Sequence, residues 1–151
     1  MSKKRNFPGV KRPYVFTPMC LDFLHHGHVN ILKNAAKYGS IILGLITDKG
    51  IKGYKKKKPI NNFKKRKSIA LLLKDVKYII PVTSLERYVP LAKKYNFDYI
   101  VHGDDWKNGP QAAFRKKLKS IVSKWRGKVI DVPYTKKISS TIIKRKIKRN
   151  K

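Results

Sequence analysis

The sequence alternates, along nearly its whole length, between short apolar runs and segments with helical spacing, and this alternation constrains the fold most. Five runs have the length and isoleucine or valine content of buried strands: residues 14–17, 40–47, 78–82, 98–103 and 128–132. Helices are predicted over 29–39, 63–75, 84–95, 114–125 and 138–150. A strand followed by a helix, repeated about five times, is typical of a parallel sheet covered by helices. We therefore expect an α/β fold with a Rossmann-like, doubly wound, parallel five-stranded sheet.

Three local features set the expected boundaries. Residues 48–61, DKGIKGYKKKKPIN, are rich in glycine and lysine and are predicted to form a loop. Ser84 is the expected N-cap of the helix over 84–95. Pro90 lies inside that helix and should kink it or divide it in two.

The length of 151 residues favours one domain, which we place over residues 1–151. Its basic ends, residues 1–12 and 148–151, are expected to be mobile. Cys20 is the single cysteine, so an internal disulfide framework is excluded and a reducing compartment is favoured. Residues 1–6 are basic, but no apolar segment follows them, and no run approaches the length of a membrane span. These features predict a soluble protein of the cytoplasm.

The net charge is extreme. The chain has 38 Lys and Arg against 8 Asp and Glu, which gives +30. A field of this strength attracts anions such as nucleotides, phosphorylated metabolites or nucleic acid. The charge is spread along the chain, and the abundance of Lys, Asn and Ile also fits an AT-rich genome. Charge alone therefore does not identify a partner.

Three histidines crowd into residues 25–28, HHGH, just before a predicted helix. His25 and His28 are three residues apart and would share a helix face. Gly27 removes a side chain where a ligand would approach, and a helix start offers free backbone N–H groups. This combination predicts a phosphate pocket, and the alternative is a pair of surface or capping histidines. A zinc site completed by Asp22 or His26 is disfavoured, because neither CxxC nor HExxH is present.

Polar clusters follow four of the predicted strands, at the edge where parallel α/β sheets bind ligands. Three of these clusters carry a resemblance: DFLHHGH (22–28), VHGDDW (101–106) and YTKKISST (134–141). In this order and spacing they resemble the HxGH, GDDW and RTxGISTT elements of cytidylyltransferase-like nucleotidyltransferases, over residues 14–148. Within that family, LITD (45–48), VHGDDWK, YT and ISST are most similar to the phosphonate cytidylyltransferase domains associated with phosphoenolpyruvate phosphomutase.

The match has departures. Met19 replaces a family glycine and Tyr134 replaces the leading arginine, and both replacements also occur in the phosphonate branch. Lys137 replaces the glycine before ISST and puts the nucleotide contacts at 136–138 in question. His102 is shared with that branch, but the resemblance assigns it no step.

The resemblance implies transfer of CMP from CTP to a phosphonate or phosphate monoester, of the 2-aminoethylphosphonate type, with release of pyrophosphate. It implies a homodimer, Mg²⁺ or another divalent cation entering with CTP, and no nucleic-acid or membrane partner. The implied catalytic residues are His25, His28, Lys55 and Lys57. The implied nucleotide-binding residues are Met19, Cys20, Asp22, Gly27, Arg66, Gly103, Asp104, Asp105, Trp106, Tyr134, Thr135, Ile138, Ser139, Ser140 and Thr141. Mg²⁺ would be met by Asp22 or Asp104, because it prefers carboxylate and substrate oxygens.

Each implied role has a plainer alternative. The lysines could be a solvated run, the aspartates could cap a helix or form a turn, and Trp106 could be core packing instead of a wall for cytosine. Residues 139–141 could cap the last helix, which is compatible with anion binding. His26, the variable position of the HxGH motif, is expected to be dispensable.

Three other functions compete. One is a cytidylyltransferase that uses glycerol 3-phosphate, phosphocholine or phosphoethanolamine, or an adenylyltransferase. Another is a basic nucleic-acid-binding protein on a catalytically retired fold. The third is a membrane-surface protein attached through its last helix, in which Ile142, Ile143 and Ile147 form an apolar stripe.

Overall fold

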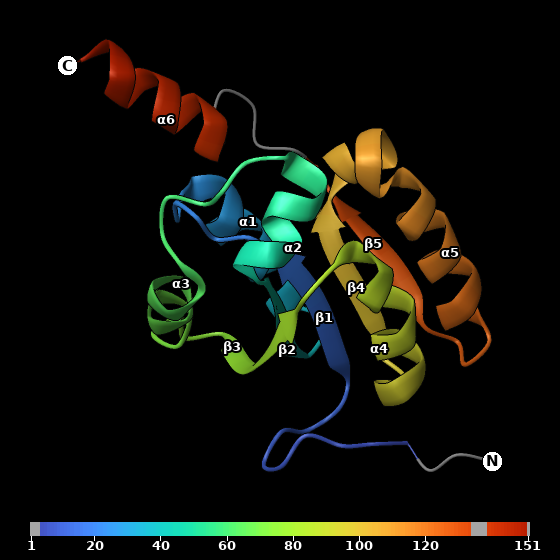
Figure 1. The fold of residues 1–151 in the computed structure, drawn as a ribbon. Coiled ribbons are helices and arrows are strands. Elements are labelled where there is room, and N and C mark those ends of the chain that lie inside the picture. Colours follow the sequence, from blue (N-terminus) through green and yellow to red (C-terminus); the bar gives the residue numbers. More distant parts are fainter. Residues whose placement is uncertain (1–3, 134–138, 151) are drawn as a thin grey trace.

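The computed structural model describes residues 4–133 and 139–150, and it is built around one parallel sheet (Figure 1). The strands are β1 (Tyr14–Met19), β2 (Ser40–Ile46), β3 (Val76–Val82), β4 (Tyr99–Gly103) and β5 (Lys128–Val132). They lie in the order β3-β2-β1-β4-β5, and every pairing between neighbours is parallel. The five strands predicted from the sequence are thereby confirmed.

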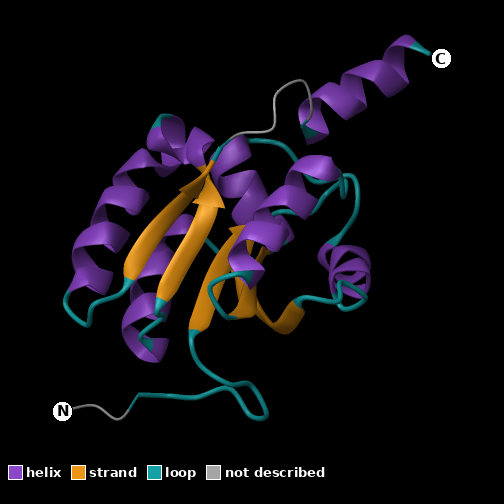
Figure 2. Cartoon of the chain, turned by 180° about the vertical axis from the view of Figure 1, so that it is seen from behind, coloured by secondary structure: helices purple, strands orange, loops and turns teal. Residues whose placement is uncertain are grey.

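Helices cover both faces of the sheet (Figures 1 and 2). They are α1 (His26–Ala36), α2 (Asp48–Lys55), α3 (Phe63–Ala70), α4 (Tyr88–Tyr95), α5 (Ala112–Ser123) and α6 (Ser140–Arg149). Three short 3₁₀ turns are η1 (Leu85–Arg87), η2 (Asp104–Lys107) and η3 (Gly109–Gln111). The doubly wound α/β fold expected from the alternation is therefore what the chain forms. α6 projects from the body of the domain (Figure 1).

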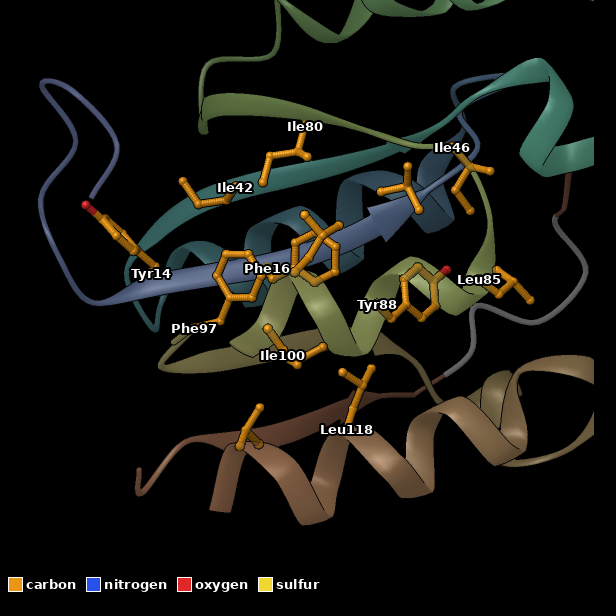
Figure 3. Packing of buried hydrophobic residues seen from close by; sticks show 14 of the residues in the cluster. Tyr14, Phe16, Ile42, Ile46, Ile80, Leu85, Tyr88, Phe97, Ile100 and Leu118 are labelled. Atoms are coloured by element: carbon orange, nitrogen blue, oxygen red, sulfur yellow. The ribbon is translucent and has the colours of Figure 1, made fainter. Parts of the chain in front are cut away.

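Two packed layers follow from the alternation of side chains along the strands. Phe16 and Ile42 point into the core that α4 and α5 cover, where Phe16 stacks on Phe97 with ring centroids 4.6 Å apart (Figure 3). Val15 and Ile41, one residue earlier on each strand, belong to the core on the side of α1 and α3. Both faces are apolar, which explains why the strands have continuous hydrophobic runs.

The segment over 48–61 is not the loop that its composition predicts, because its first eight residues form α2. Thr47 caps this helix by accepting a hydrogen bond from the Gly50 N–H at 3.1 Å, and Ile51 is buried in the core. One buried side chain and a cap outweigh the low helix propensity of two glycines.

The other predicted helices need smaller corrections. The helix over 63–75 ends at Ala70, and exposed Leu71 and Leu72 lie in the turn that leads to β3. The segment over 84–95 is divided into η1 and α4, and Pro90 lies in the first turn of α4, where its missing N–H is tolerated. Ser84 precedes η1 but its side chain makes no capping hydrogen bond.

The segment before β1 contacts the domain, although a mobile tail was expected over 1–12. Phe7 is only 3% exposed and stacks on Tyr95, with ring centroids 4.4 Å apart. Arg12 forms an ion pair with Asp98 at 3.0 Å and also donates to the carbonyl oxygen of Tyr95. An aromatic anchor and a guanidinium with several acceptors explain this attachment. Across the described residues, no helix has the length and apolar character needed to cross a membrane.

β1 and β4 are paired over only part of their length. β1 pairs with β4 at Val15↔Tyr99 and Phe16↔Ile100, near the amino end of β1, whereas β1 and β2 pair along six positions. The order of the strands also reverses between β1 and β4. The chain adds β2 and β3 on one side of β1, and then crosses over to add β4 and β5 on the other side. Ligands of open α/β sheets bind at such a switch point.

We predict that Gly44→Ala lowers the free energy of unfolding by about 1–3 kcal/mol, because the sheet leaves no room for a side chain there. An added Cβ would lie 2.6 Å from ring carbons of Phe16 and 3.2 Å from Val82. Gly53→Ala in α2 is the matched control, since its Cβ would meet nothing within 4 Å. It should be neutral or stabilising by up to about 1 kcal/mol. Urea unfolding measures both variants, and equal effects would contradict this packing.

Candidate active site

A cleft of about 650 Å³ opens at the carboxyl ends of β1 and β4. Its walls come from the loop after β1, the start of α1, the end of α2, the turns after β4 and the start of α6. Twelve of the residues assigned from the sequence line it: Met19, Cys20, His25, Gly27, His28, Lys55, Lys57, Gly103, Asp105, Trp106, Ser139 and Thr141. Segments far apart in the chain therefore meet at the switch point of the sheet.

His25 and His28 form the cap of α1. The Gly27 N–H donates to Nδ1 of His25 at 3.1 Å, and the His25 N–H donates to Nδ1 of His28 at 3.2 Å. Each side chain thus satisfies a backbone donor at the helix start, in the reciprocal arrangement of a capping box. The two imidazole rings stack, with centroids 3.9 Å apart. The alternative that these are capping histidines is therefore correct, because both side chains bind backbone N–H groups. Both rings also line the cleft, so capping and ligand binding are compatible.

The capping bonds decide which ring nitrogen carries the proton. Because Nδ1 accepts in both rings, the neutral imidazoles hold their protons on Nε2. Burial lowers the pKa of His25, and burial together with nearby His25 and Lys55 lowers the pKa of His28 to about 3. Both rings are therefore neutral at pH 7. They supply Nε2–H donors at the N-terminus of an eleven-residue helix, where anions are favoured.

Two lysines line the cleft from the end of α2. Lys55 is the last residue of the helix and Lys57 follows Lys56, which adopts a left-handed conformation at φ 58°. Both side chains are exposed, so their ammonium groups stay hydrated and can reach an anion. Because residues 48–55 form a helix instead of the predicted loop, Lys55, the first lysine of the run, is placed at the helix end.

The start of α6 faces the same cleft. The Ser139 hydroxyl accepts a hydrogen bond from the Ile142 N–H at 3.1 Å and caps the helix, and Thr141 lies two residues later, in the first turn. Ser140 begins α6, and its side chain lies outside the described part of the chain. Tyr134, Thr135 and Ile138, together with Lys137, also lie outside the described residues. Two helix starts, those of α1 and α6, therefore border one pocket.

The turn after β4 holds the acidic pair of the sequence motif. Asp105 lines the cleft with its side chain 58% exposed, whereas Asp104 does not line it. Trp106 is 2% exposed and packs in the core, and its Nε1–H donates to Oδ1 of Asp131 at 2.6 Å. Arg115 holds the same carboxylate through two hydrogen bonds, of 3.0 and 2.6 Å. Trp106 is thus principally a packed and anchored residue at the edge of the cleft.

Asp22 is not brought into the cleft. Its carboxylate accepts hydrogen bonds from the Ile60 and Asn61 N–H groups at 3.0 and 2.9 Å, and Lys144 of α6 pairs with it. Burial opposes ionisation, but the hydrogen bonds from Lys144, Asn61 and Ile60 outweigh it, so the pKa of Asp22 is lowered. Asp22 therefore ties α6 and the loop after α2 to the loop after β1.

Arg66 is also absent from the cleft wall, and its side chain is 0% exposed. Its guanidinium donates to the carbonyl oxygens of Cys20 at 2.7 Å and Ile46 at 2.6 Å. It also donates to the carbonyl oxygen of Asn61 at 3.0 Å and to the Asp48 carboxylate at 2.7 Å. Every contact of this group is with the protein, so Arg66 fixes the segments around the cleft instead of contacting its contents.

The fit of a divalent cation can be judged from these carboxylates. Among the described residues no group of three His, Cys, Asp or Glu side chains could hold a metal. Both oxygens of Asp22 are taken by protein donors. Asp105 remains as a half-exposed carboxylate at the cleft. One carboxylate fits Mg²⁺ when substrate phosphates and water supply the other ligands.

Sequence reasoning missed Asp131, Arg115 and Tyr54. Tyr54 lines the cleft and its hydroxyl lies 2.8 Å from the Cys20 sulfur. Burial raises the pKa of Tyr54, so it stays protonated. These residues lie in no recognisable motif. The sequence held one usable signal, and only for Asp131. The chain has just eight acidic residues, so each of them is a candidate for a specific role.

The family described as Cytidylyltransferase-like matches residues 16–146, which include every residue that lines the cleft. The chain belongs to this cytidylyltransferase-like family. A glycerol-3-phosphate cytidylyltransferase from Bacillus spizizenii is 33% identical over 132 residues, which are 87% of this chain and 94% of that protein. A D-beta-D-heptose 1-phosphate adenylyltransferase from Bordetella bronchiseptica is 30% identical and covers 93% of this chain and 85% of that protein.

The fold agrees with this membership. The crystal structure of a lipopolysaccharide core biosynthesis protein from Thermoplasma volcanium superimposes with a TM-score of 0.64 and 24% identity. It covers 83% of this chain and 98% of the other. A nucleotidyltransferase enzyme, as expected from the three motifs, is confirmed at the level of the cytidylyltransferase-like family. The narrower resemblance to phosphonate enzymes has no support among these relatives, whose names specify phosphate compounds.

We predict a pH-dependent stability that His28 carries. Its pKa is lowered from 6.5 to about 3 on folding, so the unfolded chain binds this proton more tightly. The stabilisation is complete above pH 6.5 and is lost as the pH falls from 6.5 toward 3. His28→Gln should therefore lose less unfolding free energy than the wild type between pH 6.5 and 5, measured by urea unfolding. His26→Gln, at an exposed position, should keep the wild-type slope. An unchanged slope in His28→Gln would contradict the burial of a neutral imidazole.

Proposed function

We propose that this cytidylyltransferase-like enzyme transfers CMP from CTP to a small phosphate monoester and releases pyrophosphate, with glycerol 3-phosphate as the best-supported acceptor. The observation that carries the proposal is the meeting of the α1 and α6 starts with Lys55 and Lys57 around one cleft. The support for the acceptor is the similarity to glycerol-3-phosphate cytidylyltransferases from two Bacillus species, which this chain covers over 94% and 95% of their length.

The proposed transfer of CMP depends on positioning of the reactants and on charge stabilisation more than on a strong base. An acceptor phosphate oxygen is already ionised at neutral pH, and it attacks the α-phosphorus of CTP. The new P–O bond forms as the bond to the leaving pyrophosphate breaks, and charge accumulates on the phosphate oxygens. Rigid donors aimed at those oxygens are the groups that accelerate such a step.

The residues of the cleft match these needs. His25 and His28 have Nε2–H donors whose orientation is fixed by the capping bonds on Nδ1. The free N–H groups at the start of α1 add to them. Lys55 and Lys57 would neutralise the triphosphate or the acceptor phosphate from the α2 side, and Ser139 and Thr141 would contact phosphate oxygens from the α6 side.

Mg²⁺ is proposed to enter with the nucleotide. When bound, it would offset negative charge on the phosphate oxygens. Asp105 is the described carboxylate at the cleft that could complete its coordination. Asp22, which the sequence also suggested, would instead keep the loop after β1 in place.

Two narrower alternatives have specific support. The similarity to a heptose 1-phosphate adenylyltransferase supports ATP as the nucleotide. The motif VHGDDWK, with His102 and Lys107, supports a phosphonate such as 2-aminoethylphosphonate as the acceptor. Pyrophosphate release should therefore be measured with CTP, UTP and ATP. Each nucleotide is combined with glycerol 3-phosphate, phosphocholine, phosphoethanolamine, 2-aminoethylphosphonate and heptose 1-phosphate. We expect CTP with glycerol 3-phosphate to be turned over fastest, and no turnover with any pair would overturn the proposed function.

We predict that His28→Ala lowers kcat by about 10²-fold or more, the usual loss for one transition-state donor. His26→Ala should change kcat by less than about twofold, since His26 is exposed and does not line the cleft. Steady-state kinetics with saturating CTP measures both. A matching loss in the two variants would contradict the role assigned to His28.

A further inference from the structure

His102 is the last side chain of β4 before the GDDW turn, and it lines the cleft although the sequence gives it no role. Its Nδ1 lies 2.8 Å from the carbonyl oxygen of Gly103. A carbonyl can only accept, so Nδ1 carries the proton and the neutral ring leaves Nε2 as an acceptor. Throughout 4–133 and 139–150, no donor satisfies Nε2.

A chain of contacts holds this ring in place. The imidazole stacks on the Trp106 indole, with centroids 4.3 Å apart and the planes 11° from parallel. The indole N–H is bound by Asp131, and Arg115 of α5 grips that carboxylate with two hydrogen bonds. Asp131 is also the ladder partner of His102 across β4 and β5. The ring is therefore positioned by two strands and a helix, which is the kind of support that a recognition group needs.

The surroundings of His102 differ from those of the histidine cap. The cations that line the cleft in the described chain, Lys55 and Lys57, come from the β2 side of the sheet, and His25 and His28 come from the start of α1. On the β4 and β5 side the walls include Pro110 and Pro133, with the Trp106 ring behind His102, and the polar side chains of Asp105, Asn108 and Gln111. Apolar and amide side chains with one carboxylate and no described cation suit a ring that carries an amino group better than a phosphate.

We propose that His102 determines specificity by accepting, at Nε2, a hydrogen bond from a substrate amino group, and that Trp106, Asp131 and Arg115 position it. The proposal rests on the proposed function. The Pro110 and Pro133 walls favour the exocyclic amino group of cytosine as the donor, and the ammonium group of an aminoalkyl acceptor has the same chemistry. Uracil presents a carbonyl oxygen at the equivalent ring position, so it would face the acceptor lone pair of His102 without a proton between them.

The test compares ratios of kcat/KM, because a loss of folded protein cancels in a ratio. One arm measures CTP against UTP with glycerol 3-phosphate. The other arm measures phosphoethanolamine against glycerol 3-phosphate with CTP. His102→Leu removes the acceptor, and His102→Gln retains an acceptor oxygen close to the position of Nε2.

We expect His102→Leu to lower the CTP over UTP ratio by about tenfold or more, the scale of one substrate hydrogen bond, through kcat/KM for CTP. His102→Gln should keep most of the ratio. A fall confined to the phosphoethanolamine ratio would support the same acceptor role, with the ammonium group as the ligand. Unchanged ratios in both arms for His102→Leu would overturn the proposal. A wild type without any turnover would instead overturn the proposed function.

The positioning role is tested by Asp131→Asn, which keeps the size of the side chain but weakens its pairing with Arg115. The ratio that depends on His102 should fall in this variant as well, by a smaller factor. Asp98→Asn is the matched control, because Asp98 pairs with Arg12 at 3.0 Å near the amino end of β4, away from the cleft. It should lower the melting temperature without changing either ratio. Equal ratios in Asp131→Asn and the wild type would overturn the positioning role.

Discussion

The buried guanidinium of Arg66 is the constraint on which the cleft depends. It joins the carboxyl end of β1 at Cys20, the carboxyl end of β2 at Ile46, and the start of α2 at Asp48. A cation without solvent contact is costly unless its donors are satisfied, so these segments must stay where they satisfy it. Asp22 has the same role with the opposite charge, since its carboxylate accepts hydrogen bonds from the backbone N–H groups of residues 60 and 61 and pairs with the ammonium group of Lys144. Together the two residues hold the loops that carry His25 and Lys57.

The histidine cap joins stability and chemistry in one group of atoms. The Nδ1 atoms of His25 and His28 satisfy the helix start, and this use leaves each Nε2–H free to donate toward the cleft. The same tautomer that stabilises α1 is therefore the one that a polyanion requires. His102 has the opposite assignment, because a carbonyl takes its Nδ1 proton. Backbone partners thus set two kinds of imidazole, one donating and one accepting, in one cleft.

The net charge of +30 has a limited meaning in this structure. Within residues 4–133 and 139–150, two lysines line the cleft, whereas the other lysines and arginines are distributed over helices, loops and strands. The few acidic residues are more informative, because Asp22, Asp98 and Asp131 each bind at least one cation and one other donor. In so basic a chain the carboxylates are the organising groups.

The sequence by itself determined the five strands, most of the helices and the family, because strand and helix patterns are local and the three motifs are contiguous. It misassigned residues 48–55, since the burial of Ile51 is a tertiary fact that, together with the local cap by Thr47, outweighs two glycines. It also placed Asp22 and Arg66 in the cleft, because position in a motif does not reveal which partner a charge will find. Only the tertiary structure decided that these two charges bind the protein, that Trp106 is anchored by Asp131 and Arg115, and that His102 presents an acceptor. The contacts that decide Asp22, Arg66 and Trp106 join residues 16 to 122 positions apart, which no local pattern records. The tautomer of His102 is set by the neighbouring Gly103 carbonyl, and only the fold places that ring at the cleft.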